Sequence, residues 1–197
     1  HDYYNAPLHL GHFWFITFSM IRKAVILPYR GIYPKIDETA FIAPNVSIVG
    51  DVEIGAHANI WYGCSIRGDV HEVRIGARSN IQENSVIHTT GGVSGTYIGD
   101  DVTVGHGCIL HACTVGNHGF VGMGSCLLDE SAVEDFAMLA AGSLLTPKKI
   151  IPTGQLWAGR PARYTRDLTA EEKENAKQSA QNYVALGKEH KNEIENQ

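Results

Sequence analysis

Residues 42–66 read IAPNVSIVGDVEIGAHANIWYGCSI, and an isoleucine recurs at every sixth position of this stretch. After a three-residue insertion the frame resumes at Ile75, and after a second insertion, near residues 90–95, it resumes at Ile98. One residue is dropped later, and the frame then runs to Leu145. A spacing of six fits neither the period of two of a strand nor the 3.6 of a helix. It predicts short strands separated by turns, three to a coil, around the interior of a triangular prism. The frame positions, all Ile, Val or Leu, are Ile42, Ile48, Ile54, Ile60, Ile66, Ile75, Ile81, Ile87, Ile98, Val104, Leu110, Val115, Val121, Leu127, Val133, Leu139 and Leu145.

The fourth residue after an aliphatic frame position is usually small, and we expect it to tuck in beside the aliphatic side chain. Together the two patterns predict a mainly β, parallel β-helix over residues 42–147. Cys64 and Cys108 fall on the small position and are interpreted as buried apolar residues. The four cysteines form no CxxC pair, which favours free thiols in a reducing, cytoplasmic compartment. The small positions include Val46, Val52, Ala58, Cys64, Ser79, Ser85, Cys108, Ser125, Ala137 and Ser143.

The segments that flank the repeats differ from them. Residues 1–19 hold an apolar run too short to span a bilayer, and we interpret them as a vector-derived or mis-started, non-native extension in preference to a native anchor. Residues 20–41 are a lead-in to the repeats, and the prolines and glycines of residues 148–168 predict a connecting loop.

Residues 169–197 predict a C-terminal α-helix. Thr169 stands at its N-cap, and Glu172 is placed to complete a capping box. One face of the helix is apolar or small, and we expect that face to dock along the prism. The residues of this face are Ala176, Ala180, Tyr183, Val184 and Gly187.

Composition excludes some classes of partner. The chain has 197 residues, enough for one domain, and a formal net charge of −5 without any run of lysine or arginine. Because binding to a nucleic acid backbone needs a basic face, nucleic acid is not expected as a partner, and neither is a membrane.

Two histidines fall at equivalent places in successive coils. Three frame positions make one coil, and Leu110 is the third frame position after Ile87 once the insertion near residues 90–95 is counted as a loop. His88, directly after Ile87, and His111, directly after Leu110, therefore lie on the same side of the prism. Stacked strands are about 4.8 Å apart. The two imidazoles could therefore bind one metal ion at about 2.0–2.1 Å.

A third histidine lies on the preceding side of the prism. His106 is five residues before His111, roughly 15 Å along an extended strand, so a neighbouring chain would have to supply it. A homotrimer would then hold three sites, each with His88 and His111 from one subunit and His106 from the next. Three neutral nitrogen ligands with an open fourth position are typical of a catalytic zinc site, which makes hydroxide available near pH 7.

Charged and polar residues accompany these histidines. Arg67 lies one coil beneath His88, with Asp69 two residues on, and Glu83, next to Gln82, lies one coil beneath His106. Such residues orient ligands, bind substrate or tie subunits together.

The segments IRGD (66–69), NIQENSVIH (80–88) and VGHGCILH (104–111) resemble the signature of the γ-class carbonic anhydrases, which are hexapeptide-repeat proteins. The run VGMG (121–124) is also similar to that family. The resemblance implies a left-handed β-helix and reversible hydration of carbon dioxide to bicarbonate by zinc-bound hydroxide, with iron or cobalt as alternative metals. It implies that the three histidines bind the metal, that Arg67 and Asp69 form an intersubunit ion pair, and that Gln82 and Glu83 flank the metal-bound water.

The sequence departs from the family pattern near the site. The loop of residues 89–96 contains no carboxylate, and Val70 replaces a glutamate, which leaves the proton shuttle open. His71 or Glu72 could substitute for it. By resemblance to short-loop members of the family, a helix tyrosine, Tyr183, or its neighbour Asn182 lies near the metal-bound water.

Other functions stay open at this point, because a fold does not determine a function. The same metal site could serve an acyl-CoA thioesterase or another hydrolase. The repeat also occurs in hexapeptide acyltransferases, although a transferase would need only one histidine as general base. A non-catalytic scaffold that keeps the metal for trimer stability is the fourth interpretation.

Overall fold

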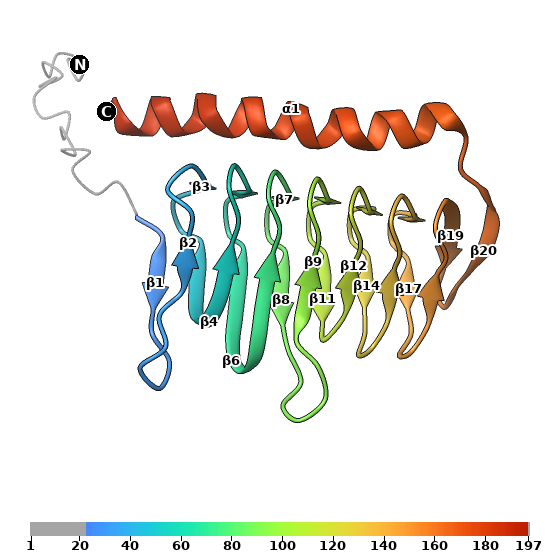
Figure 1. Cartoon of the computed structure of the whole chain (residues 1–197), viewed down its shortest axis with the longest axis horizontal. Coiled ribbons are helices and arrows are strands. Elements are labelled where there is room, and N and C mark those ends of the chain that lie inside the picture. The colour runs from blue at the N-terminus through green and yellow to red at the C-terminus, as the bar shows by residue number, and fades with distance from the viewer. Residues whose placement is uncertain (1–22, 197) are drawn as a thin grey trace, which may run out of the picture.

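The computed structural model describes residues 23–196, so the interpretation of residues 1–19 lies outside the described part of the chain. The chain winds into a stack of coils whose strands pair in parallel with those of the coils above and below (Figure 1). The prediction of a mainly β, parallel β-helix with a C-terminal helix is confirmed. No helix within residues 23–196 is both long and apolar enough to cross a membrane.

The prism has three faces, and one 12-stranded sheet covers two of them because β4 and β6 bend round the corner between them. We call one of these the histidine face. It consists of β1 (Val25–Leu27), the first parts of β4 (Ser47–Ile54) and β6 (Ser65–Ile75), β8 (Val86–His88), β11 (Ile109–His111), β14 (Cys126–Leu127) and β17 (Leu144–Leu145). The second face consists of β2 (Lys35–Ile36), the later parts of β4 and β6, β9 (Thr96–Ile98), β12 (Thr114–Val115), β15 (Ala132–Val133) and β18 (Ile150–Ile151).

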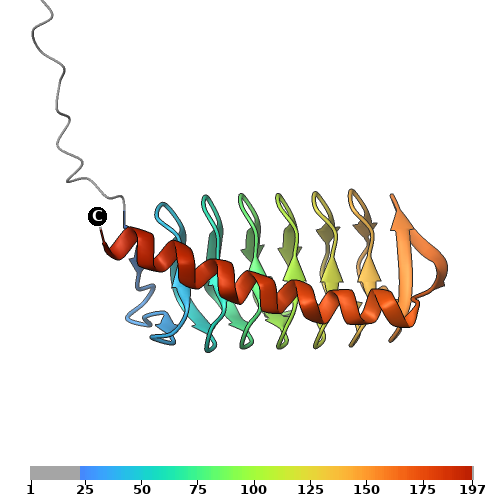
Figure 2. The same ribbon diagram turned by 90° about the horizontal axis from the view of Figure 1, so that it is seen from above.

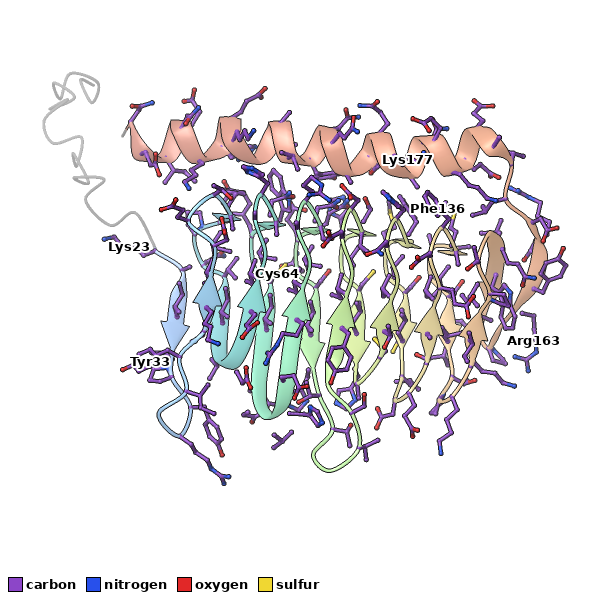
Figure 3. The ribbon with its side chains drawn as sticks, viewed as in Figure 1. Lys23, Tyr33, Cys64, Phe136, Arg163 and Lys177 are labelled. Atoms are coloured by element: carbon purple, nitrogen blue, oxygen red, sulfur yellow. The ribbon has the colours of Figure 1, made fainter. Side chains whose placement is uncertain are left out.

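The helix face carries the smaller, eight-stranded sheet and the C-terminal helix. Helix α1 (Ala170–Glu195) runs back along the stack toward the first coils and contacts β3, β5, β7 and β10 (Figure 2). Near the start of the helix, Lys177 lies over the ring of Phe136, 5.6 Å from its centroid (Figure 3). The strands of this face are β3 (Phe41–Ile42), β5 (Asn59–Ile60), β7 (Asn80–Ile81), β10 (Thr103–Val104), β13 (Phe120–Val121), β16 (Met138–Leu139), β19 (Gln155–Gly159) and the antiparallel β20 (Ala162–Asp167).

The interior of the prism holds the predicted aliphatic ladder. Every frame position from Ile48 to Leu145 is buried, and only Ile42, in an early coil, is partly exposed. The small residues are buried beside the ladder, including Cys64 and Cys108. Removing apolar surface from water stabilises a fold by about 25 cal/mol per Å². Because every coil buries apolar surface in this way, the ladder is the main source of stability.

Glycines allow β4 and β6 to bend at the corner between the histidine face and the second face. Gly50 has a φ of +80°, a region that side chains rarely adopt. At Gly68 a Cβ atom would lie 2.2 Å from the backbone oxygen of Asp51. The close approach of the two backbones places Asp69, the next residue, at the end of the histidine face.

Both flanking segments contain more strand than the repeat pattern predicted. Residues 20–41, the lead-in, contain β1, β2 and part of β3, which pair with β4 and β5. Residues 148–168, predicted as a connecting loop, contain β18, β19 and β20. The loop prediction missed them because Ile151 and Trp157 continue the stacking, pairing with Val133 and Leu139, while the prolines and glycines fall between the strands.

Helix α1 begins as predicted. Thr169 is the N-cap, its hydroxyl accepts a hydrogen bond from the Glu172 backbone N–H, and the Glu172 side chain accepts one from the Thr169 N–H. Arg166 donates two further hydrogen bonds to Glu172, each of 2.8 Å. The hydrogen bonds from Arg166 and then from Thr169 lower the pKa of Glu172 to about 2.

We expect the stability difference between the wild-type protein and Glu172→Gln to depend on pH. Because the folded-state pKa is depressed, the contribution of the carboxylate is complete above its unfolded pKa of about 4.3 and fades as pH falls toward 2. Denaturant unfolding at several pH values should show the difference narrowing over this range. Glu171→Gln, one residue away, is the control, and a difference that stays constant from pH 7 to pH 2 would contradict the prediction.

Candidate metal centre

Two histidines meet where the histidine face ends. His88 and His111 are the last residues of β8 and β11, and they are paired in register. Each follows a fully buried residue, Ile87 or Leu110, so its ring points outward from the prism. The rings face each other with His88 Nδ1 3.2 Å from His111 Nε2.

A carboxylate contacts the outer nitrogen of each ring. Asp69 Oδ1 lies 3.0 Å from His88 Nε2, and Asp129 Oδ1 lies 2.8 Å from His111 Nδ1. Arg67 forms an ion pair with Asp69 of the same chain. Burial raises the pKa of Asp69, but hydrogen bonds from His88 and Arg67 outweigh it and lower the pKa below its usual value. Hydrogen bonds from His111 and then from Thr90 lower the pKa of Asp129.

The protonation of these groups suits a cation between the rings. Ionised Asp69 and Asp129 only accept hydrogen bonds, so the outer nitrogens of His88 and His111 carry the protons. In neutral imidazoles the inner nitrogens then carry lone pairs that face each other at 3.2 Å. Nitrogens bound to one tetrahedral zinc ion at about 2.0–2.1 Å would be roughly 3.3–3.4 Å apart. The donor pair therefore fits a metal ion.

The second predicted group lies at the other end of the same strands. His106 follows β10 and Glu83 follows β7, both in turns that lead onto the histidine face. Glu83 Oε2 is 2.6 Å from His106 Nδ1, as expected for residues one coil apart. The His106 side chain is 49% exposed, so its Nε2 is accessible to another molecule.

Gln82 and Tyr183 lie on the helix face near Glu83. Gln82 is 5% exposed, and its Nε2 donates a 3.0 Å hydrogen bond to Asn80 Oδ1. Tyr183 is half-buried on α1 and packs edge-on against Trp61, with ring centroids 5.6 Å apart. Burial and then the neighbouring Glu83 carboxylate raise the pKa of the Tyr183 hydroxyl, which keeps it protonated at neutral pH.

The single chain thus brings the predicted residues together as two half-sites. One half-site holds Arg67, Asp69, His88 and His111, and the other holds Gln82, Glu83, His106 and Tyr183. Within residues 23–196, no hydrogen bond or ion pair joins them, and no three histidine, cysteine, aspartate or glutamate side chains of the chain form a group that could hold a metal. The half-sites lie at opposite ends of β8 and β11, so these strands separate them.

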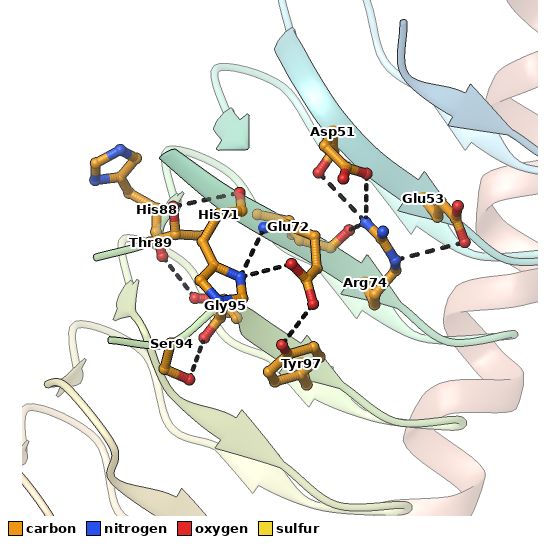
Figure 4. Close-up of polar contacts among 12 residues, drawn as sticks. Asp51, Glu53, His71, Glu72, Arg74, His88, Thr89, Ser94, Gly95 and Tyr97 are labelled. Carbon is orange, nitrogen blue, oxygen red and sulfur yellow. Dashed lines mark hydrogen bonds and ion pairs between the residues drawn. The ribbon is translucent and has the colours of Figure 1, made fainter. Parts of the chain in front are cut away.

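His71 and Glu72, the alternative shuttle residues, belong to a hydrogen-bond network that continues onto the second face. Glu72 accepts a 2.7 Å hydrogen bond from the Tyr97 hydroxyl, and its other oxygen lies 2.6 Å from His71 Nδ1 (Figure 4). The hydrogen bond from Tyr97 is the main cause that lowers the pKa of Glu72. In the described part of the chain, no hydrogen bond links this network to the rings of His88 or His111.

Two residues at the site were not predicted from the sequence. Asp129, in the turn after β14, contacts His111, and Thr90, in the loop after β8, donates a 2.8 Å hydrogen bond to Asp129. Asp129 is 18 residues from His111, but the coil between them is one residue shorter than that, so the spacing signal points to Leu128 and not to Asp129.

Comparisons with known proteins agree with this architecture. A family model described as bacterial transferase hexapeptide (six repeats) matches residues 33–68. A crystal structure of a hexapeptide transferase family protein from Anaplasma phagocytophilum superimposes with a TM-score of 0.80 and 54% identity, covering 83% of this chain and 96% of that chain.

Two curated relatives are named as carbonic anhydrases. Carbonic anhydrase of Geobacillus kaustophilus is 42% identical over 167 residues, which cover 85% of this chain and 91% of the relative. Mitochondrial γ-carbonic anhydrase 2 of Arabidopsis thaliana is 47% identical over 165 residues, which cover 81% of this chain. The match spans 59% of the length of that plant relative.

Proposed function

The chain belongs to the γ-class carbonic anhydrase family of hexapeptide-repeat proteins, and on that premise we propose that it forms a homotrimer that hydrates carbon dioxide reversibly at metal sites between subunits. The observation that carries the proposal is the convergence of His88 Nδ1 and His111 Nε2 at 3.2 Å, each ring held from behind by a carboxylate. Carbon dioxide and bicarbonate are the substrate pair.

His88 and His111 of one subunit and His106 of the next would hold the metal. Imidazole suits zinc and iron, and cobalt is the third metal that the family resemblance implies. A zinc ion with three imidazole ligands and an open position supplies hydroxide as a nucleophile near neutral pH. Glu83 supports this ligand set because it holds His106 by Nδ1 and leaves Nε2 free to bind.

The surface of the histidine face supports a trimer. Its outward positions form a largely apolar column that runs from coil to coil between the two half-sites, and we name it the apolar column: Val86, Ile109, Cys126 and Leu144. Val86 is 42% and Ile109 46% exposed in the single chain. Covering this column with a neighbouring subunit buries apolar surface and brings the His106 end of one subunit to the His88 end of another.

The remaining residues have roles that their contacts support. Asp69 orients His88, and Arg67 neutralises Asp69 and would also tie the subunits together in the trimer. The amide of Gln82, fixed by Asn80, can donate its other N–H to an oxygen of the nucleophile or substrate.

Protons at the site are handled by two further side chains. Glu83 is the carboxylate beside His106 and can accept a proton. The hydroxyl of Tyr183, which stays protonated at neutral pH, would be available as a hydrogen-bond donor. The free thiols of all four cysteines support a reducing compartment such as the cytoplasm.

Metal content measured together with carbon dioxide hydration tests the proposal. We expect about one zinc, iron or cobalt ion per chain in protein purified without a chelator or a histidine tag, and measurable hydration. His111→Ala should lose both. His118→Asn is the matched control, because His118 lies in a turn on another part of the prism, at a φ of 57° that asparagine tolerates.

The outcomes separate the functions. Metal without hydration would reject the carbonic anhydrase activity and favour a metal-dependent thioesterase or a scaffold, to be followed by assays on acyl-CoA. Protein that binds no metal under any loading condition would refute the proposal.

A further inference from the structure

The loop after β8 reaches past the next coil, which contains β11, to the turn after β14. Thr90 and Ser94 form two backbone hydrogen bonds across the loop. The nitrogen-to-oxygen distance is 3.1 Å from Thr90 N to Ser94 O and 3.2 Å from Ser94 N to Thr90 O. Gly91 lies against Val70, since a Cβ added at Gly91 would sit 3.3 Å from the Val70 Cβ. The loop is therefore closed on itself and held against β6, which fixes the position of the Thr90 side chain.

From that position Thr90 contacts both members of the Asp129–His111 pair. Its hydroxyl donates a 2.8 Å hydrogen bond to Asp129 Oδ2, and its oxygen lies 3.4 Å from His111 Nδ1. Asp129 uses its other oxygen, Oδ1, for His111 Nδ1. The backbone oxygen of Asp129 accepts a hydrogen bond from Lys148 N, which anchors the turn to the following coil.

We propose that Asp129 and Thr90 are positioning residues that hold the His111 ring with Nε2 directed at the metal site. This inference rests on the proposed metal centre. An acceptor on Nδ1 fixes both the tautomer and the rotation of the ring, so that the lone pair is on Nε2. The loop of residues 89–96 contains no carboxylate of its own, but the hydroxyl of its Thr90 holds the carboxylate of Asp129.

Each of the three histidines then has its own carboxylate. Asp69 serves His88, Glu83 serves His106 and Asp129 serves His111. The Asp129 pair alone receives support from the loop after β8. A substitution of Thr90 should therefore weaken the Asp129–His111 contact and leave the Asp69–His88 and Glu83–His106 contacts unchanged.

The test measures zinc affinity of the full-length protein by competition with a chromophoric chelator. We expect Asp129→Leu to weaken zinc binding by about 10–100-fold and Thr90→Val, which removes only the hydroxyl, to weaken it by a few-fold. Asp129→Asn should recover most of the loss, because its side-chain oxygen still accepts a hydrogen bond from His111 Nδ1. The control is Glu130→Gln, which removes the adjacent carboxylate that contacts Lys148 and should leave affinity unchanged.

Nitrogen-15 spectra of the metal-free protein give an independent readout. We expect the proton of His111 on Nδ1 in the wild-type protein and in Asp129→Asn, and on Nε2 in a substantial fraction of Asp129→Leu. A purely structural effect of the substitution would not move this tautomer equilibrium.

These results distinguish the two proposals. Wild-type affinity in both Asp129→Leu and Thr90→Val, or equal loss in Asp129→Asn and Asp129→Leu, would overturn the positioning role while the metal centre stands. Wild-type protein that shows Nδ1 protonation but binds neither zinc, iron nor cobalt would refute the proposed function and leave the Asp129 contact intact. If Asp129→Leu does not fold, Thr90→Val with unchanged affinity and tautomer would overturn the inference.

Discussion

Mixing His88→Ala chains with His106→Ala chains should restore metal sites that neither variant has alone. In the proposed trimer a site needs His88 and His111 from one subunit and His106 from the next. Each single variant lacks a ligand at every site, so we expect each to lose zinc and to lose hydration by roughly a thousandfold or more. After random exchange of subunits at equal amounts, about a quarter of the interfaces combine an intact His88 with an intact His106.

The matched control for this experiment mixes His88→Ala with His111→Ala. Both ligands come from the same side of the interface, as their 3.2 Å contact shows, so no interface in the mixed trimer can regain a complete set. Subunit exchange is followed by mass spectrometry of differently labelled chains. Recovery in the control mixture, or none in the test mixture once exchange is demonstrated, would contradict a site shared between subunits.

A charge placed on the apolar column should dissociate the trimer. Ile109 lies in the middle of the column on the histidine face and is 46% exposed in the single chain. Ile109→Glu would bury a carboxylate in each of the three interfaces without a partner, which costs far more than one hydrogen bond contributes. We expect analytical ultracentrifugation to show a mass about one third of that of the wild-type trimer, with loss of bound zinc.

Ile150→Glu is the control for the charge itself. Ile150 occupies an outward position of β18 on the second face and is 50% exposed, so the two substitutions match in residue type, outward orientation and accessibility. It should leave the mass and zinc content unchanged. Circular dichroism should show the same β-helix in both variants, because neither side chain contributes to the interior ladder. A trimeric Ile109→Glu, or a monomeric Ile150→Glu, would refute the assignment of the histidine face to the interface.

Much of the candidate site could be predicted because the repeat converts spacing into position. The pairing of His88 with His111 follows from the equivalence of Ile87 and Leu110 in successive coils, which the structure bears out. The contact of Glu83 with His106 follows from the same frame. The roles of these residues at a metal ion stay predictions until the experiments above are done.

The sequence did not predict the contact of Asp129 with His111, because the repeat is irregular at this point. One residue is dropped in the coil after Leu110, so Leu110 pairs with Leu127 and the residue in register with His111 is Leu128. Asp129 is one residue further, in a turn whose next residue, Glu130, has a positive φ of 59°. Spacing alone could not show that the turn directs this carboxylate at the His111 ring.

The sequence by itself determined the parallel β-helix, its buried ladder and the docking helix. Each hexapeptide carries the same local information, an aliphatic residue that points into the prism and a turn that follows it. Where this repeat pattern weakens, only the tertiary structure decided which residues form strands. Strands β1 and β2 form because β4 offers them a partner, and β19 forms because β16 does. The partners of the ring nitrogens were also decided by the folded chain, since Thr90 and Asp129 meet only when a closed loop and a turn 39 residues apart are stacked side by side.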